Sequence, residues 1–191
     1  MIVSRLELRL LVGLFLLLFS LTSCGYRWGQ GDVLLNNQAI FVPYIENDKD
    51  GRYTAALVRT LSQQSRLIYS DCSATFLLKV KLLDFYDVDI GFRYDRNKCG
   101  EYTKSVIPDE TRLSVDAEVQ LVEIATGKCL LGPVIINAEV DFDHDYYSAR
   151  TADNVFSLGQ LSDYDAAYDA AHSPLSKCLS RKILDFINAN W

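Results

Sequence analysis

The sequence predicts an α+β fold, a two-layer sandwich in which two helices cover one face of a four-stranded, mostly antiparallel sheet. Three runs, 76–94, 112–124 and 130–142, alternate apolar with polar residues, which is the period of a strand with one apolar face. Two others, 53–68 and 164–187, place apolar residues three or four positions apart, as an amphipathic helix does. With a further strand near residue 40, the predicted order is β-α-β-β-β-α.

The N-terminus has the pattern of an export signal. Arg5 and Arg9 precede an apolar run from Leu10 to Phe19, and small residues follow. The run is short for a membrane helix, which needs about 20 apolar residues. We therefore expect three parts: a signal peptide at 1–23 that is removed, a lipidated N-terminus and spacer at 24–38, and a single α+β domain at 39–191.

Cys24 is the predicted site of lipidation. The segment Leu21-Thr22-Ser23-Cys24 resembles the bacterial lipobox, in which the cysteine thiol is joined to diacylglycerol, the chain is cut before it and the new amino group is acylated. The alternative is a cysteine buried in a membrane anchor. Two or more acyl chains hold a protein on a bilayer where one does not, so Cys24 would tether the domain to a membrane. Gly25, in place of Asp, resembles an outer-membrane address.

Composition and charge narrow the classes of function. Of the 191 residues, 49% are hydrophobic and 12% aromatic, which is enough to bury a core and argues against disorder. The formal net charge is −6, and it becomes −7 once Arg5, Glu7 and Arg9 are removed with the signal. An acidic protein binds the phosphate backbone poorly, so we exclude nucleic-acid binding.

The first half of the domain is expected to hold one strand and one helix. Ala39–Ile45 is rich in β-branched and aromatic residues and predicts the strand. Asp48 or Asp50 can cap the helix that follows. The helix would run from Tyr53 with apolar positions at Ala56, Leu57, Leu61, Leu67 and Ile68.

Three long strands and a helix follow. In the first strand the even positions from Phe76 to Tyr94 would form one apolar face, and the irregularity at Leu83-Asp84-Phe85 predicts a bulge. A long loop, 95–109, separates it from the second strand, and the turn at 125–128 joins the second strand to the third as a hairpin. In the C-terminal helix we expect Pro174 to interrupt or restart the helix.

Four cysteines remain after Cys24, an even number that permits two disulfides in an exported chain. Cys99 and Cys129 lie at opposite ends of the run 112–124, roughly 40 Å apart, which excludes a bond between them. We predict that Cys72 pairs with Cys129, which leaves Cys99 with Cys178. The alternative is four reduced cysteines or mixed partners.

The chain resembles the lipopolysaccharide-assembly lipoproteins (LptE-like). The resemblance lies in the lipobox with Cys24-Gly25-Tyr26, the strand Ile40-Phe41-Val42-Pro43-Tyr44, and the order of elements that follows. It implies an outer-membrane lipoprotein, facing the periplasm or a barrel lumen, that plugs a β-barrel partner which inserts lipopolysaccharide. It also implies contact with lipopolysaccharide itself.

An anionic lipid needs cations, and the candidate contacts lie on or just beyond the first long strand. The alternative is that these side chains are simply the solvated side of a sheet. The candidates are Lys79, Lys81, Arg93, Arg96, Lys98 and Lys104.

Catalysis has little support in the sequence. Carboxylates around His144 (Asp141, Asp143 and Asp145) or His172 (Asp165 and Asp169) could hold a metal, but such groups more often end a solvated strand or helix, and we predict no metal or cofactor. Neither a nucleophile motif nor a phosphate-binding glycine loop is present. We therefore expect a non-enzyme, either the lipopolysaccharide-assembly component or a tethered periplasmic regulator or adaptor of another envelope machine, such as a cell-wall synthase. A hydrolase that depends on His144 or His172 is a distant third.

Overall fold

The computed structural model describes residues 38–64, 67–97, 99–146 and 163–190. The chain divides into two units, Met1–Val33 and Leu34–Trp191, and all the described residues belong to the second. Cys24, the predicted lipidation site, therefore lies outside the described residues, and so does Lys98.

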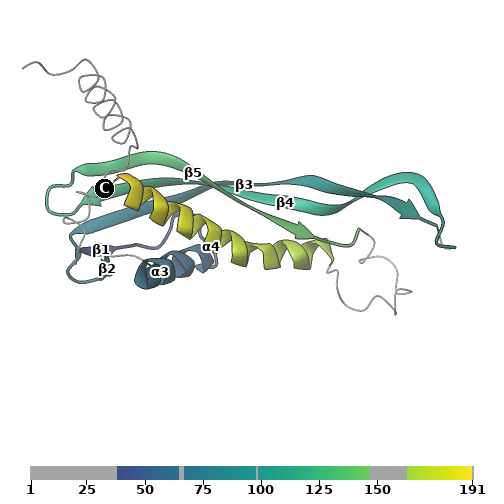
Figure 1. Cartoon of the computed structure of the whole chain (residues 1–191). Coiled ribbons are helices and arrows are strands. Elements are labelled where there is room, and N and C mark those ends of the chain that lie inside the picture. The colour runs from purple at the N-terminus through teal and green to yellow at the C-terminus, as the bar shows by residue number, and fades with distance from the viewer. Residues whose placement is uncertain (1–37, 65–66, 98, 147–162, 191) are drawn as a thin grey trace, which may run out of the picture. The chain divides into compact units, whose positions relative to one another are not determined.

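A five-stranded sheet carries two helices on one face (Figure 1). The strands lie in the order β2-β1-β3-β4-β5; β1 is parallel to both neighbours, and the other pairs are antiparallel. The predicted α+β fold class is confirmed. The strands are β1 (Ala39–Phe41), β2 (Ile68–Tyr69), β3 (Phe76–Arg96), β4 (Tyr102–Glu123) and β5 (Cys129–Asp143), and the helices are α3 (Arg52–Gln64) and α4 (Tyr164–Asn190).

The fifth strand, β2, comes from residues that the sequence pattern had placed in the first helix. The helix α3 ends at Gln64, and Ile68 and Tyr69 pair instead with β1. Leu67 still points into the core, at 4% exposure. The burial of Leu67 explains why the sequence pattern wrongly predicted helix here. An apolar residue at helical spacing can also be buried by a turn that leads into an edge strand.

The expected loop at 95–109 is wrong. Strand β3 continues to Arg96 and β4 begins at Tyr102, and the N–H of Asn97 donates to the carbonyl of Glu101 between them. Pro108 lies within β4 although proline lacks an N–H to donate to the ladder. It is accommodated opposite Phe92, next to a shift in register, where the ladder is already irregular.

An aspartate that precedes each helix accepts a backbone N–H from its first turn. Asp48 accepts from the N–H and the hydroxyl of Thr54, at 2.8 and 2.7 Å, which makes it the cap expected for α3. Asp163 accepts from the N–H of Ala166 at 2.9 Å at the start of α4. Pro174 does not interrupt α4, contrary to expectation: it is exposed, so the missing hydrogen bond falls on the solvent side of a continuous helix.

The core lies between the helices and the half of the sheet near β1. Every fourth residue of α4, from Ala167 to Ile187, is buried, and Tyr53, Leu57 and Leu61 of α3 pack beside them. Leu78 and Leu82 of β3 and the odd residues 113–121 of β4 complete this layer. Burying each large aliphatic side chain stabilises the fold by about 1.5–3 kcal/mol.

Candidate functional site: an apolar stripe on the long hairpin

A bulge in β3 decides which side chains face the helices. Leu82 lies opposite Ala117 and Phe85 opposite Val115, so that β3 has one residue more than β4 between these two pairs. The predicted bulge is confirmed, but its consequence for the faces differs from the expectation. Even residues of β3 face the helices only as far as Leu82, and from Tyr86 onward they face away.

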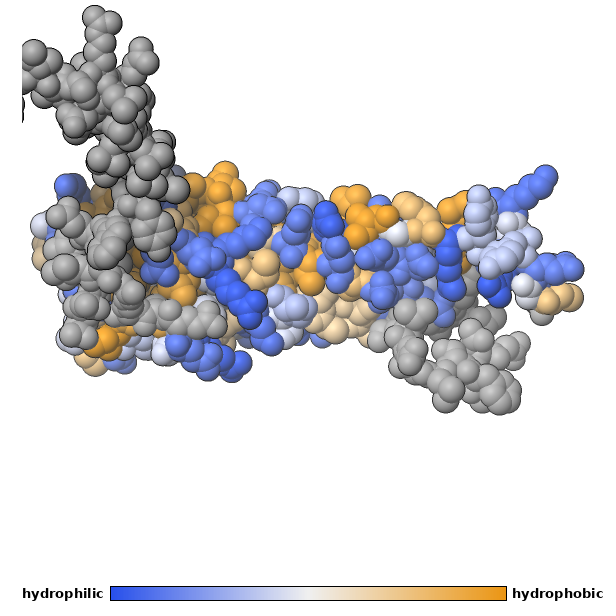
Figure 2. All heavy atoms as spheres, in the orientation of Figure 1, coloured by the Kyte–Doolittle hydropathy of each residue, from blue (hydrophilic) through white to orange (hydrophobic). Residues whose placement is uncertain are grey.

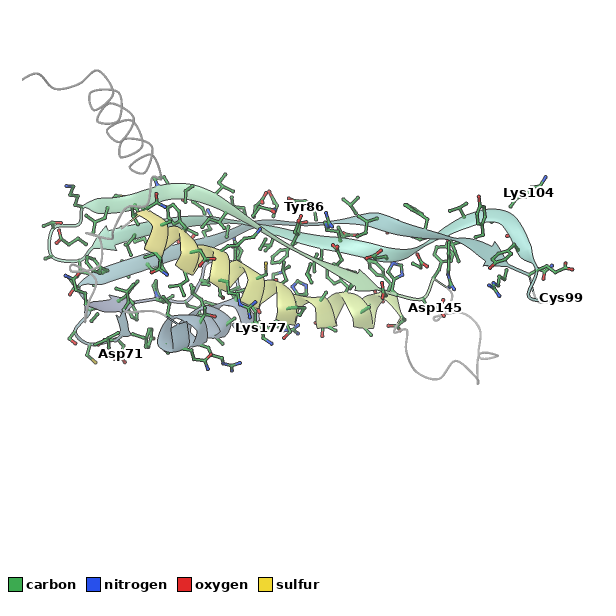
Figure 3. All side chains as sticks on the ribbon, viewed as in Figure 1. Asp71, Tyr86, Cys99, Lys104, Asp145 and Lys177 are labelled. Atoms are coloured by element: carbon green, nitrogen blue, oxygen red, sulfur yellow. The ribbon has the colours of Figure 1, made fainter. Side chains whose placement is uncertain are left out.

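The reversal creates an exposed row of large apolar side chains on the sheet face away from the helices. Tyr86, for example, lies opposite Ser114 and points away from α4 (Figure 3). The members are between 44% and 68% exposed, and hydrophobic residues recur between hydrophilic ones along the hairpin (Figure 2). We call this row the apolar stripe: Tyr86, Val88, Phe92, Tyr94, Tyr102 and Val106.

Gly91 allows the two strands of the stripe to approach. A Cβ atom at this position would lie about 2.5 Å from the Cβ of Glu110, closer than any real contact. The register also shifts on both sides of Gly91, which twists the hairpin beyond the end of β5. Glycine at this position therefore keeps the stripe continuous across the bend.

Basic side chains accompany the stripe. Arg96 stacks on the ring of Tyr102, with Cζ 4.5 Å from the centroid, and its Nη2 donates to the Tyr102 hydroxyl at 2.7 Å. Lys104 extends from the same side near the tip of the hairpin (Figure 3). Lys79 and Lys81 lie on this face too, before the bulge, because they pair with Gln120 and Glu118 of β4.

The predicted basic residues do not form one cluster. Lys79 and Arg96 are separated by seventeen positions of one strand, roughly 50 Å. Arg93 lies on the opposite face, where it meets Asp145 at 3.3 Å and Asp109 at 3.8 Å. Lys79, Lys81, Arg96 and Lys104 are therefore spread along the outer face, and only Arg96 and Lys104 lie at the distal end of the stripe.

The helix-facing side of the same hairpin is held by aromatic and hydroxyl groups. Tyr164 and Tyr168 of α4 contact Phe142 of β5, with ring centroids 5.9 and 6.3 Å apart. The Tyr164 hydroxyl also donates to Asp87 at 2.7 Å. Burial of the Tyr164 side chain and its hydrogen bond to the Asp87 carboxylate raise the pKa of Tyr164. These contacts join the N-terminal half of α4 to the distal sheet, and in the described part of the chain both helices lie on this face.

Both histidines are partners of hydroxyl groups. His144 is buried, and its Nε2 lies 2.8 Å from the hydroxyl of Thr111, which itself donates to Asp89. Nδ1 of His172 lies 2.8 Å from the hydroxyl of Tyr53, and burial lowers the pKa of His172. Among the residues that the structure describes, no three His, Cys, Asp or Glu side chains are arranged to hold a metal ion.

The four described cysteines are free thiols. Cys72 and Cys129 lie at the same end of the sheet, as expected, because Ile124 just before the 125–128 turn donates its N–H to Thr75. Their pairing stays a prediction.

A bond between Cys99 and Cys178 does not fit the fold. Cys99 is at the tip of the hairpin, whereas α4 starts beside Asp87 and runs away from that tip (Figures 1 and 3). Cys178 lies fourteen residues along the helix, roughly 20 Å farther from the tip.

No helix in the described part of the chain combines the length and apolar character needed to cross a membrane. No protein-family model matches the sequence, and no curated protein matches it either.

The chain is similar, at low identity, to solved structures whose names describe them as lipoproteins. A minor lipoprotein from Acinetobacter baumannii is 15% identical, with 82% of this chain and 92% of that chain covered and a TM-score of 0.46. A lipoprotein from Caulobacter crescentus CB15 is 13% identical, with 78% and 88% covered and a TM-score of 0.48. The rare lipoprotein B from Shewanella oneidensis is 14% identical, with 80% and 95% covered and a TM-score of 0.44. These similarities concern the fold and assign no activity.

Proposed function

We propose that this chain is a lipid-anchored outer-membrane protein that assembles with a β-barrel partner in the transport and insertion of lipopolysaccharide. The observation that carries the proposal is the apolar stripe, a row of exposed aromatic and aliphatic side chains on an otherwise polar hairpin. Large exposed apolar patches mark surfaces that meet a partner or a lipid. The stripe is a surface of this kind.

The basic groups beside the stripe suit an amphipathic anion. Acyl chains would lie on the rings of Phe92 and Tyr94, while phosphate groups would meet Arg96 and Lys104 at the distal end. Lysine and arginine side chains can also bury their aliphatic stems on the same surface. The short N-terminal sequence segments resemble those of lipopolysaccharide-assembly lipoproteins, and this resemblance supports the same role.

The proposed role is non-enzymatic. In the described part of the chain both histidines are bonded to hydroxyls of the packed interior rather than turned toward an open cleft. A protein that holds a barrel or a lipid acts through surface complementarity, and the hairpin supplies that surface.

Co-purification from outer membranes tests the proposal. The affinity-tagged full chain, extracted in mild detergent, should retain a large β-barrel protein. The variant Val88→Thr/Phe92→Thr/Tyr94→Thr should retain at least tenfold less, because it removes apolar contacts but keeps strand-forming residues. A matched control, Tyr44→Thr/Ile68→Thr/Ile124→Thr, removes exposed apolar residues outside the stripe and should behave as wild type.

The same experiment addresses the alternative of a tethered regulator or adaptor. Recovery of a periplasmic or inner-membrane cell-wall enzyme, with no barrel protein, would contradict the proposed function. Equal recovery of the barrel protein by the stripe variant and by wild type would mean that the apolar stripe does not bind the barrel.

A further inference from the structure

A basic groove lies between the two helices, on the side of the domain away from the apolar stripe. Its volume is about 480 Å³, and it is lined only by residues of α3 and α4. None of its described lining residues is acidic, although the whole chain carries a net charge of −6. Positive charge is thus concentrated in one place on a negatively charged protein.

Helical spacing builds the groove. On α3 the lining positions are 52, 55, 56, 59, 60 and 63, and on α4 they are 173, 176, 177 and 181, a single stripe on each helix. Two lining residues, Thr60 and Ser176, are buried, whereas Ala55 and Ser173 are exposed. The lining therefore combines short side chains with long cationic side chains that are exposed to solvent.

One of the four cations is already neutralised. Arg52 closes one end of the groove, where its Nη1 lies 2.8 Å from the carboxylate of Asp169 and its Nε 3.6 Å from that of Asp50. This pairing with Asp169 raises the pKa of Arg52 and fixes the side chain.

The other three cations are unpaired. Arg59, Lys177 and Arg181 have no hydrogen bond or ion pair within the described residues, and all three are exposed. Lys177 lies between α4 and α3 in Figure 3. Three like charges around one small groove repel one another, and an anion held between them would relieve that repulsion.

We propose that this groove binds a phosphate group, carried either by the headgroup of an anionic phospholipid or by a soluble phosphorylated compound. Two guanidinium groups and an ammonium group match the several oxygens of a phosphate, and guanidinium binds such oxygens in pairs. The volume suits a headgroup rather than a segment of folded protein. The site is separate from the stripe and does not depend on the proposed function.

Isothermal titration calorimetry of the full chain in non-ionic detergent tests the site. The probes are inorganic phosphate and glycerophosphoglycerol, the soluble headgroup of phosphatidylglycerol, with glycerophosphocholine as the zwitterionic comparison. A salt concentration near 0.15 M limits general attraction to about 8 Å. We expect saturable binding of at least one anionic probe at one site per chain.

Two kinds of variant distinguish binding in the groove from nonspecific electrostatic attraction to the protein. Arg59→Gln/Lys177→Gln/Arg181→Gln should weaken binding at least tenfold, whereas Lys79→Gln/Lys81→Gln/Lys104→Gln removes the same charge from the sheet and should change it less than twofold. Ala55→Trp fills the groove without altering charge, at an exposed position, and should weaken binding to a similar extent as the first variant. Circular dichroism would verify that each variant is folded.

The outcomes distinguish the two sources of the phosphate group, and some of them would contradict the proposed site. Tighter binding of glycerophosphoglycerol than of phosphate indicates a lipid headgroup, and the reverse indicates a soluble phosphate compound. The proposal is overturned by the absence of saturable binding, by equal losses in the two triple variants, or by unchanged binding in Ala55→Trp. Tighter binding of a tri-glutamate peptide than of either probe would also overturn it, in favour of an acidic protein segment.

Discussion

His172 lies where α3, α4 and the distal sheet meet. Its ring packs edge-on against Phe85 and Tyr168, with centroids 5.4 and 5.1 Å away, and it is hydrogen-bonded to the hydroxyl of Tyr53. Burial lowers the pKa of His172, and the charge of Arg52 lowers it further. Asp169 and Asp50 act in the opposite direction but have less effect. The folded protein therefore favours the neutral ring.

The neutral ring makes stability depend on pH. Because the pKa of His172 is lower in the folded state than in the unfolded state, where it is about 6.5, the unfolded chain binds the proton more tightly. The contribution of His172 to the free energy of unfolding should therefore be largest above pH 6.5. It should fall as the pH is lowered toward 5, by at most about 1.4 kcal/mol per pH unit. Urea unfolding at pH 7.5, 6.5 and 5.5 measures this loss.

The variant His172→Asn isolates the effect, because the amide can still bond to Tyr53 but does not titrate. We expect a lower stability at pH 7.5 and a flatter dependence on pH between 6.5 and 5.5. The ion pair between Arg112 and Asp141 should not contribute to this pH dependence. Arg112 lowers the pKa of Asp141, so that this carboxylate is protonated only below about pH 4. A slope as steep in the variant as in wild type would assign the acid sensitivity to another group.

Strand β3 serves two purposes along its length. Before the bulge its even residues belong to the core, and after the bulge its even residues form the apolar stripe. Leu82 of β3, for example, is 1% exposed in the core, while Phe92 of the same strand is 60% exposed. Apolar residues of one strand therefore contribute to stability in one half and to surface chemistry in the other.

A pair of substitutions distinguishes these purposes. Leu82→Ala should lower the free energy of unfolding by about 2–5 kcal/mol, because it leaves a cavity in the core between the sheet and the helices. Phe92→Thr should change it by less than about 0.5 kcal/mol, because its ring has little burial to lose and threonine also favours strands. Urea midpoints at constant m-value measure both. A loss of 2 kcal/mol in Phe92→Thr would mean that this ring is packed in solution and that the stripe is part of the core.

Attachment to a membrane concerns the molecule as a unit, and it depends on one thiol outside the described residues. We expect metabolic labelling with a radioactive fatty acid to mark the wild-type chain and to leave Cys24→Ala unlabelled and no longer membrane-bound, since several acyl chains are needed for stable anchoring. The matched control is Cys72→Ala, which removes an exposed cysteine of the domain and should keep the label. Labelling of Cys24→Ala at the wild-type level, or no labelling of either chain, would remove the anchor from the proposed function.

Much of the secondary structure could be predicted because it depends on local patterns. Alternation over residues 112–124 predicted the second half of β4, and the 125–128 turn and the bulge near Asp84 were both indicated by residue order. Less could be predicted where the partner mattered more than the segment. Residues 102–109 do not look like a strand until β3 is placed beside them, and Ile68–Tyr69 is a strand only because β1 offers an open edge.

The candidate surfaces differ in the same way. The six basic residues were recognisable one by one, but which of them share a face depends on the register across the bulge, and Arg93 lies on the face opposite Lys79 and Lys81. The basic groove was missed altogether. Its cations come from two helices more than a hundred residues apart, and no spacing within either helix indicates that Arg59 and Lys177 border one space.

The order of residues is sufficient for most of the long strands and the two helices, for the cap of α3 and for the lipobox-like segment, because propensity, periodicity and capping act over a few positions of the chain. The direction of the β3 side chains beyond Leu82, the apolar stripe and the groove between α3 and α4 required the assembled fold. One extra residue in a ladder turns every later side chain to the other face, and two helices form a groove only when a common core holds them together.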